Sequence, residues 1–204
     1  DVPSMPILLT PISELTHVVQ VGYGSFGTAL GGPGEGSSLL RRVGENMLGA
    51  LASFANFDDV VFSAFAPNAN FGSITQPYYW TDFDWPDRDA QGFDGCDFNG
   101  FGPECTFVGD VLSTDWFDGD ALPREVGTAP GDSGSPLIVD ELYDFPVATA
   151  VLSGGVVFFD LSFLGLPNTY GDISFYNPIY PFFQFISENT AYKYVSANQG
   201  NGNW

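Results

Sequence analysis

The chain has 204 residues, of which 44% are hydrophobic and 16% aromatic, and this is enough for one domain with a core of its own. Its formal net charge of -20 comes less from its 25 acidic residues than from having only 5 lysines and arginines. A surface of this charge repels the phosphates of nucleic acids and of anionic membranes, so neither is expected as a partner.

The composition favours strands over helices. The 25 glycines and 15 prolines suit many short strands joined by turns, and we therefore predict an all-β fold. No apolar stretch is long enough to span a bilayer, and the chain begins at Asp1 without a basic or signal-like apolar segment. We expect a secreted or cell-surface protein whose signal has been removed.

The first 65 residues predict a connector followed by strands. Residues 1–15 are apolar and interrupted by prolines, which indicates an extended segment lying on a hydrophobic surface. Residues 16–24 alternate and are rich in β-branched side chains, which predicts a strand, and a glycine-rich loop is expected over 31–36. Residues 60–65 are predicted to form another strand.

Residues 66–121 lose this regular pattern and are rich in Asp, Gly, Phe, Trp and Tyr. We predict that they form an insertion packed by its own aromatic side chains. Cys96 and Cys105 enclose a turn-rich loop within it, and we predict that they form a short disulfide. Two free buried thiols are the alternative.

The same segment holds a cluster of four carboxylates, Asp82, Asp84, Asp87 and Asp89. Ca²⁺ takes several oxygen ligands from a turning backbone, which makes this cluster a weak candidate calcium site. Its spacing matches no EF-hand, and a solvated acidic loop is the alternative. No cofactor is expected.

The second half of the chain is organised around one turn, Gly131-Asp132-Ser133-Gly134-Ser135-Pro136. Glycines on both sides of a serine permit a sharp turn and let a substrate carbonyl approach main-chain N–H groups, which a Cβ would obstruct. Ser133 is therefore the candidate nucleophile, and the backbone N–H groups of Gly131 and Ser133 are the candidate oxyanion donors. An ordinary turn between two strands is the alternative.

Four strands are predicted after this turn, over residues 137–139, 147–152, 156–159 and 173–176. Phenylalanines at helix-compatible spacing then predict a helix within residues 180–192. Residues 191–204 are polar at their end and are not expected in the core.

Together with its flanks, the Ser133 turn resembles the nucleophile motif of the chymotrypsin/trypsin family of serine endopeptidases. Residues 16–24 resemble the strand that opens the second barrel of that family, and residues 41–48 resemble the next strand in a bacterial subgroup. The resemblance implies that residues 1–190 are the C-terminal half of a trypsin-like protease domain, an antiparallel β-barrel with an insertion over about 66–121 and a terminal helix over about 180–190. Residues 191–204 resemble the start of a β-solenoid region, with a disordered tail as the alternative.

The resemblance also implies roles for individual residues. Asp132 corresponds to the acid that, in relatives activated by cleavage, pairs with a new N-terminal ammonium. Asp1 does not lie at that position, so a cation from another segment or a preformed oxyanion hole is expected instead. Gly127 corresponds to the floor of the specificity pocket, and its wall is Ser153, Gly154 and Gly155. These residues predict an open, neutral pocket that favours apolar or aromatic residues over Lys and Arg.

One feature departs from the family. The only histidine is His17, which lies on the first predicted strand and not in a small-residue turn ending in Ala-His. We interpret His17 as structural, with a substitute catalytic base as the alternative. In the family, the histidine and aspartate of the triad come from the first barrel, upstream of everything present in this chain.

The sequence therefore predicts a secreted serine endopeptidase that hydrolyses peptide bonds through an acyl-enzyme on Ser133. Its histidine and aspartate would come from an upstream first-barrel segment of the same precursor, so that this chain alone is not expected to be active. The alternative is a catalytically inactive trypsin-like barrel that serves in an assembly or as an adhesive surface protein. A carbohydrate-binding β-domain that uses exposed Trp and Tyr side chains is a third possibility, based on composition alone.

Overall fold

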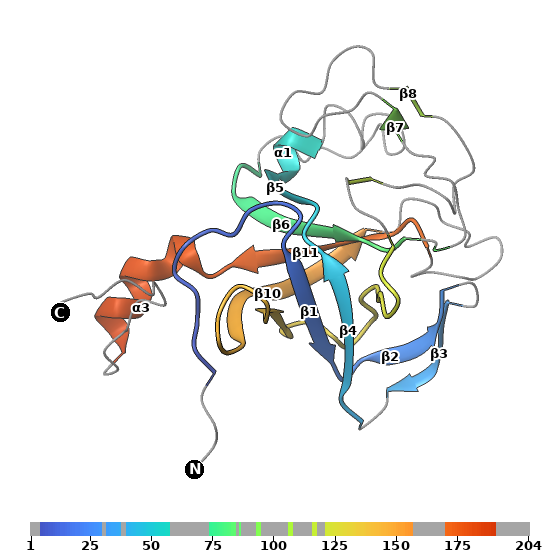
Figure 1. The fold of residues 1–204 in the computed structure, drawn as a ribbon, viewed down its shortest axis with the longest axis horizontal. Coiled ribbons are helices and arrows are strands. Elements are labelled where there is room, and N and C mark those ends of the chain that lie inside the picture. The colour runs from blue at the N-terminus through green and yellow to red at the C-terminus, as the bar shows by residue number, and fades with distance from the viewer. Residues whose placement is uncertain are drawn as a thin grey trace.

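The computed structural model shows a β-rich fold built on one antiparallel sheet of seven strands (Figure 1). It describes residues 5–29, 32–37, 40–57, 74–84, 86, 93–94, 106–107, 116–117, 121–156 and 170–190. In spatial order, the strands of the sheet are β4 (Arg42–Met47), β1 (His17–Gly22), β9 (Pro136–Val139), β10 (Val147–Val156), β11 (Ile173–Pro178), β6 (Pro77–Asp82) and β5 (Ala50–Ser53).

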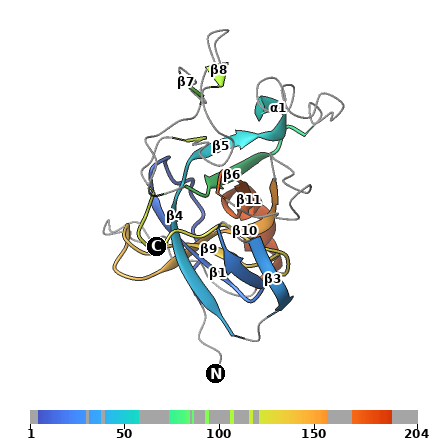
Figure 2. The ribbon, with the colours of Figure 1, turned by 90° about the vertical axis from the view of Figure 1, so that its right-hand side faces the viewer.

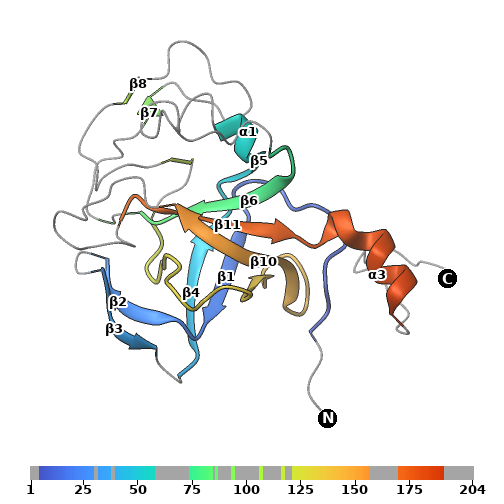
Figure 3. The same ribbon diagram turned by 180° about the vertical axis from the view of Figure 1, so that it is seen from behind.

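Smaller elements lie around this sheet. The hairpin of β2 (Ser25–Thr28) and β3 (Gly32–Ser37) projects from one side, while η4 (Tyr180–Phe182) and α3 (Phe183–Asn189) project from the other (Figures 1 and 3). A third group lies at one end of the molecule, beyond β5 and β6 (Figure 2). It consists of α1 (Phe54–Phe57), β7 (Phe93–Asp94) and β8 (Thr106–Phe107).

Apolar side chains from both halves of the chain fill the core. In the larger cluster, Val18 of β1, Leu137 of β9 and Val147 of β10 are fully buried beside Tyr79 and Tyr176. The second cluster is aromatic and centres on Trp80, whose indole N–H donates to the carbonyl of Ala52 over 2.8 Å. Burial of this kind is the main favourable contribution to folding, and it fixes the strands that flank the Ser133 turn.

The prediction of an all-β fold is confirmed, whereas a closed barrel is not shown. Among the described residues, β4 and β5 are the two edges of the sheet and do not pair with each other. The strands predicted at 16–24, 41–48, 137–139, 147–152 and 173–176 are all present.

The N-terminal connector also lies where the sequence predicts. The N–H of Leu8 donates to the carbonyl of Ala148 over 2.8 Å, and the N–H of Ala148 donates to the carbonyl of Pro6 over 2.9 Å. Leu8 and Ile12 are buried against the core. The connector is therefore an extended strip that adds to the β10 region of the sheet.

Two sequence predictions are wrong. Part of the predicted insertion, Pro77–Asp82, is strand β6, which lies between β11 and β5 and carries the fully buried Tyr79 and Trp80. Its aromatic residues are buried from both faces, so the strand lacks the alternation of a half-exposed strand. The predicted loop at 31–36 is wrong as well, because Gly32–Ser37 forms β3 and pairs with β2.

Other predictions lie outside the described residues. These are the strand over 60–65, the Cys96–Cys105 disulfide, residues 157–159 and the tail 191–204.

The predicted terminal helix is present, but its phenylalanines are not buried. Phe182 is 45% exposed, Phe183 51% and Phe185 65%. The spacing of the phenylalanines thus predicted the helix correctly, but it gave no guide to whether these side chains are buried. Among the described residues, no helix has the length and apolar character needed to cross a membrane.

Removing one tyrosine hydroxyl should test the packing of the connector. In Tyr79→Phe the N–H of Ile12 loses its acceptor at 2.9 Å, and a buried unpaired donor costs about 1–3 kcal/mol. Tyr176→Phe is the matched control, because the hydroxyl of Tyr176 is equally buried and has no hydrogen-bond partner within the described part of the chain. Urea unfolding should show a clear loss for Tyr79→Phe and little or none for Tyr176→Phe; equal losses would contradict the assignment.

Candidate active site

The turn that carries Ser133 depends on two glycines in the left-handed region. Gly131 has φ of 99° and Gly134 has φ of 88°, a conformation that side chains with a Cβ rarely adopt. The N–H of Gly134 donates to the carbonyl of Leu152 over 3.0 Å, and the N–H of Leu152 donates to that of Ser135 over 2.8 Å. These bonds fix the turn on β10, and Ser133 itself is exposed.

The N–H groups of this turn divide into two sets. The N–H of Asp132 donates to the carbonyl of Ala129 over 3.1 Å, and the N–H of Ser135 donates to the carbonyl of Asp132 over 3.0 Å. The N–H of Gly134 donates to β10. Within the described part of the chain, the N–H groups of Gly131 and Ser133 donate to no protein acceptor. The two donors predicted for an oxyanion hole are therefore available to a ligand oxygen.

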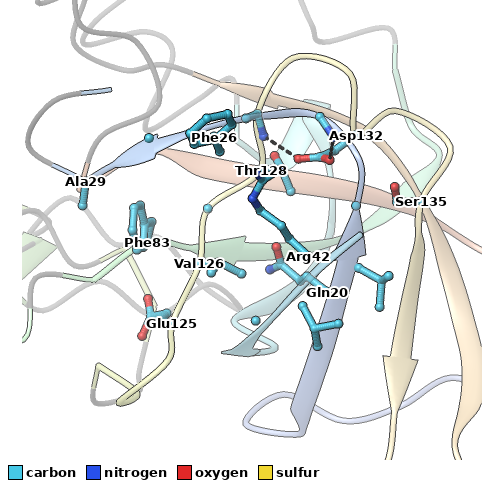
Figure 4. Close-up of a pocket in the computed structure, with 18 of the residues that line it drawn as sticks. Gln20, Phe26, Ala29, Arg42, Phe83, Glu125, Val126, Thr128, Asp132 and Ser135 are labelled. Carbon is cyan, nitrogen blue, oxygen red and sulfur yellow. Dashed lines mark hydrogen bonds between the residues drawn. The ribbon is translucent and has the colours of Figure 1, made fainter. Parts of the chain in front are cut away.

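The side chain of Asp132 turns inward and is held by backbone. Its Oδ1 accepts from the N–H of Gly24 over 2.7 Å, and its Oδ2 accepts from the N–H of Ala129 over 3.1 Å (Figure 4). A Cβ on Gly24 would lie 2.7 Å from Oδ1, and one on Gly22 would overlap it. The Gly-Tyr-Gly triplet at the end of β1 is thus the surface on which this carboxylate rests.

A cavity of about 670 Å³ lies behind the turn, between β1, β2, β4 and residues 122–129. Arg42 extends into it with Cζ 4.3 Å from the centre of the Phe26 ring, as Figure 4 shows. Among the described residues, its buried Nη1 has no acceptor, Gln20 Oε1 has no donor, and the Tyr176 hydroxyl on the cavity wall has no hydrogen-bond partner. Burial raises the pKa of the Tyr176 phenol far above its usual value, so this group is neutral.

This arrangement addresses the expected partner of Asp132. No cation of the described residues lies within ion-pair distance of its carboxylate, and two backbone N–H groups hold it instead. Arg42 lines the same cavity as Asp132. The choice between a cation from another segment and a preformed oxyanion hole stays a prediction.

The residues predicted to line the specificity pocket lie together beside the turn. Gly155 of β10 pairs with Ser174 of β11, and Gly154 pairs with Phe175. Gly127 is covered by Phe83, whose Cδ1 would lie 3.0 Å from a Cβ at that position.

Two polar residues that the sequence analysis did not select lie between these walls. The hydroxyls of Thr128 and Ser174 are 2.7 Å apart and form a hydrogen bond. This hydrogen bond joins the segment after Gly127 to β11, where Ser174 pairs with Gly155, and the openness of the pocket stays a prediction. Only their positions after Gly127 and opposite Gly155 could have indicated them.

His17 lies far from Ser133. Its Nδ1 is 3.1 Å from Asp140 Oδ1 and its Nε2 is 3.6 Å from Glu45 Oε2. Pairing of β1 with β9 sets His17 beside Asp140, at the opposite end of β9 from the turn, which at about 3.3 Å per strand residue is a separation of roughly 13 Å or more. His17 is therefore structural in this arrangement and does not act as the base of Ser133.

Glu45 connects this histidine to the neighbouring loop. Its carboxylate also pairs with Arg124 over 3.0 Å, and the hydrogen bond from Arg124 holds the pKa of Glu45 below its usual value. These exposed contacts position strands and contribute little to stability.

The candidate calcium residues serve structural roles where they are described. Asp82 Oδ2 accepts from the N–H groups of Trp116 and Phe117, over 2.9 and 3.2 Å, and Asp84 is buried. No group of three or more His, Cys, Asp or Glu side chains suited to a metal is found among the described residues. Asp87, Asp89, Cys96 and Cys105 lie outside them.

Comparisons with known proteins do not identify the chain. No protein-family model matches it, and no curated protein sequence matches it. What the site does must therefore be argued from its geometry.

Removal of the Asp132 carboxylate should loosen the turn. Asp132→Ala leaves the N–H groups of Gly24 and Ala129 without acceptors, and we expect a loss of about 2 kcal/mol or more in the free energy of unfolding. Asp140→Ala is the control, since its carboxylate has only an exposed contact with His17 and should cost less than about 1 kcal/mol. Similar losses for the two variants in urea unfolding would show that Asp132 does not support the turn.

Proposed function

We propose that this chain carries the nucleophile half of a serine endopeptidase site, on the second barrel of a trypsin-like domain. The observation that carries this proposal is the division of N–H groups in the turn, where those of Asp132 and Gly134 are bonded and those of Gly131 and Ser133 have no acceptor among the described residues. Gly131 and Ser133 are exposed, so an ordinary turn would leave these donors to water. An oxyanion hole requires two donors left available in this way.

The order of the sheet strands supports the trypsin-like barrel. Its two edges, β4 and β5, are consecutive in the chain and are separated only by Leu48 and Gly49. In a sheet that curls into a barrel, the edge strands meet, and here a two-residue connection keeps their ends together.

The chemistry follows from the exposed hydroxyl and the two donors. Ser133 Oγ attacks the scissile carbonyl and gives its proton to a base, while the N–H groups of Gly131 and Ser133 stabilise the oxygen as it becomes negative. The C–N bond then breaks and the base returns the proton to the leaving amine. Water hydrolyses the resulting acyl-enzyme by the same steps and frees the serine.

The base must come from another polypeptide segment. The sequence contains a single histidine, His17. It lies on β1 beside Asp140, at the end of β9 that is farther from the Ser133 turn. A partner segment that carries a histidine and an aspartate would complete the triad. Its simplest source is an upstream segment of the same precursor. The exposed phenylalanines of η4 and α3 offer apolar surface of the kind that such a partner covers.

Because the single histidine, His17, lies away from Ser133, a second function is also favoured. If no partner supplies a histidine, the domain is an inactive relative that serves in an assembly, and Ser133 is a remnant. The two functions differ in whether Ser133 reacts in the assembled native protein.

Labelling with a fluorophosphonate tests the nucleophile. We expect the native protein, with whatever co-purifies with it, to be labelled at Ser133 and to lose the label completely in Ser133→Ala. The thermal midpoint of Ser133→Ala should equal that of the native protein, because Ser133 is exposed. Ser135→Ala, two residues away in the same motif, is the control and should keep the label. A native assembly that is folded and does not react would favour the inactive function.

The need for a partner gives a separate prediction. The native protein should run as two bands under denaturing conditions and as one species without denaturant, and only the pair should hydrolyse peptides. Intact mass and N-terminal sequencing identify the second band. A 204-residue chain that hydrolyses peptides by itself would show that the base has been misassigned.

A further inference from the structure

In a trypsin-like site, which the proposed function assumes, a substrate side chain would enter beside Ser133 between β10 and residues 127–128. Gly155 provides the first wall, with Ser174 directly opposite it on β11. Thr128 provides the second, and its hydroxyl is hydrogen-bonded to that of Ser174 over 2.7 Å. Backbone register and a hydrogen bond therefore fix both walls.

These walls are too close for a large side chain. A Cβ placed on Gly155 would lie 3.6 Å from Thr128 Oγ1, so with a carbon–carbon bond of about 1.5 Å the Gly155 Cα is at most about 5 Å from that oxygen. An aromatic ring or a methylene chain needs about 7 Å between the atoms on its two sides, since each contact takes about 3.5 Å. At the depth of Thr128, neither fits.

We infer that the specificity slot of this site accepts only glycine, alanine or serine before the scissile bond, and that Thr128 and Ser174 set this limit. The inference rests on the proposed endopeptidase function. It replaces the preference for apolar or aromatic residues that Gly127 suggests in the sequence. A methyl or hydroxymethyl group ends above the Thr128–Ser174 bond, whereas any longer side chain must displace it.

Displacing that bond is costly for a larger substrate. Ser174 is 5% exposed, so a ring that separates the two hydroxyls would break a buried hydrogen bond, at a cost large enough to reduce reactivity at least tenfold. The carboxylates near residues 127–128 are held by backbone. Asp132 accepts from the N–H groups of Gly24 and Ala129, and Glu125 accepts from those of Asp84 and Leu122.

Phosphonate probes that differ only in one side chain measure this limit. Peptidyl diphenyl phosphonates with Ala, Phe or Lys at the first position are applied to the assembled native protein, and their rates of labelling at Ser133 are divided by that of a fluorophosphonate without a side chain. We expect the Ala probe to react at least tenfold faster than the Phe and Lys probes.

Variants of Thr128 and Ser174 test whether their hydrogen bond sets the limit on the size of the substrate side chain. Thr128→Gly removes the hydroxyl and the Cβ and should raise the Phe-to-Ala ratio at least tenfold, whereas Thr128→Ser keeps the hydroxyl and should leave the ratio near that of the native protein. Ser174→Ala breaks the same bond from the other strand and should raise the ratio by a smaller factor, and it serves if Thr128→Gly does not fold.

The outcomes separate this inference from the proposed function. If the fluorophosphonate labels Ser133 and the Phe probe reacts as fast as the Ala probe, the inference is overturned and the endopeptidase function stands. A ratio that is unchanged in both Thr128→Gly and Ser174→Ala also overturns it. If the fluorophosphonate does not label the assembled protein, the function fails and the inference fails with it.

Discussion

The contact on which the site depends is the carboxylate of Asp132 between two backbone N–H groups, those of Gly24 and Ala129. It joins the end of β1 to the segment before Ser133, which are 108 residues apart in sequence. An inward aspartate fixes the direction of the peptide groups on either side of it. The N–H groups of Gly131 and Ser133, which have no acceptor among the described residues, alternate with those of Asp132 and Gly134, which donate inside the protein.

The glycines of the chain make this contact possible. Gly22 and Gly24 leave the volume that the carboxylate fills, and Gly131 adopts a backbone conformation that other residues rarely reach. On β10, a Cβ on Gly155 would lie 3.6 Å from Thr128 Oγ1, next to the Thr128–Ser174 bond. In the proposed endopeptidase site, one set of small residues would position Ser133 and another would limit the side chain that reaches it.

Local signals predicted much of the fold and only part of the site. The alternation of residues 17–22 and the apolar run 137–139 specify strands by themselves, and the Gly-Asp-Ser-Gly pattern specifies an exposed turn. Strand β6 was missed because its two faces are buried in different parts of the core, Tyr79 in the larger cluster and Trp80 in the aromatic one, which no local pattern reveals. The Thr128–Ser174 bond joins residues 46 positions apart, so neither sequence segment indicates it by itself.

The central claim is that Gly131 and Ser133 offer their N–H groups to an oxyanion, and amide NMR of the turn tests it most directly. Once Ser133 carries a phosphonyl group, its phosphonyl oxygen stands in for the oxygen of the tetrahedral intermediate. The account predicts that the amide protons of Gly131 and Ser133 move strongly downfield, while those of Asp132 and Gly134 stay near their original positions because they remain bonded to Ala129 and Leu152. Unchanged Gly131 and Ser133 signals in a phosphonylated protein would contradict it.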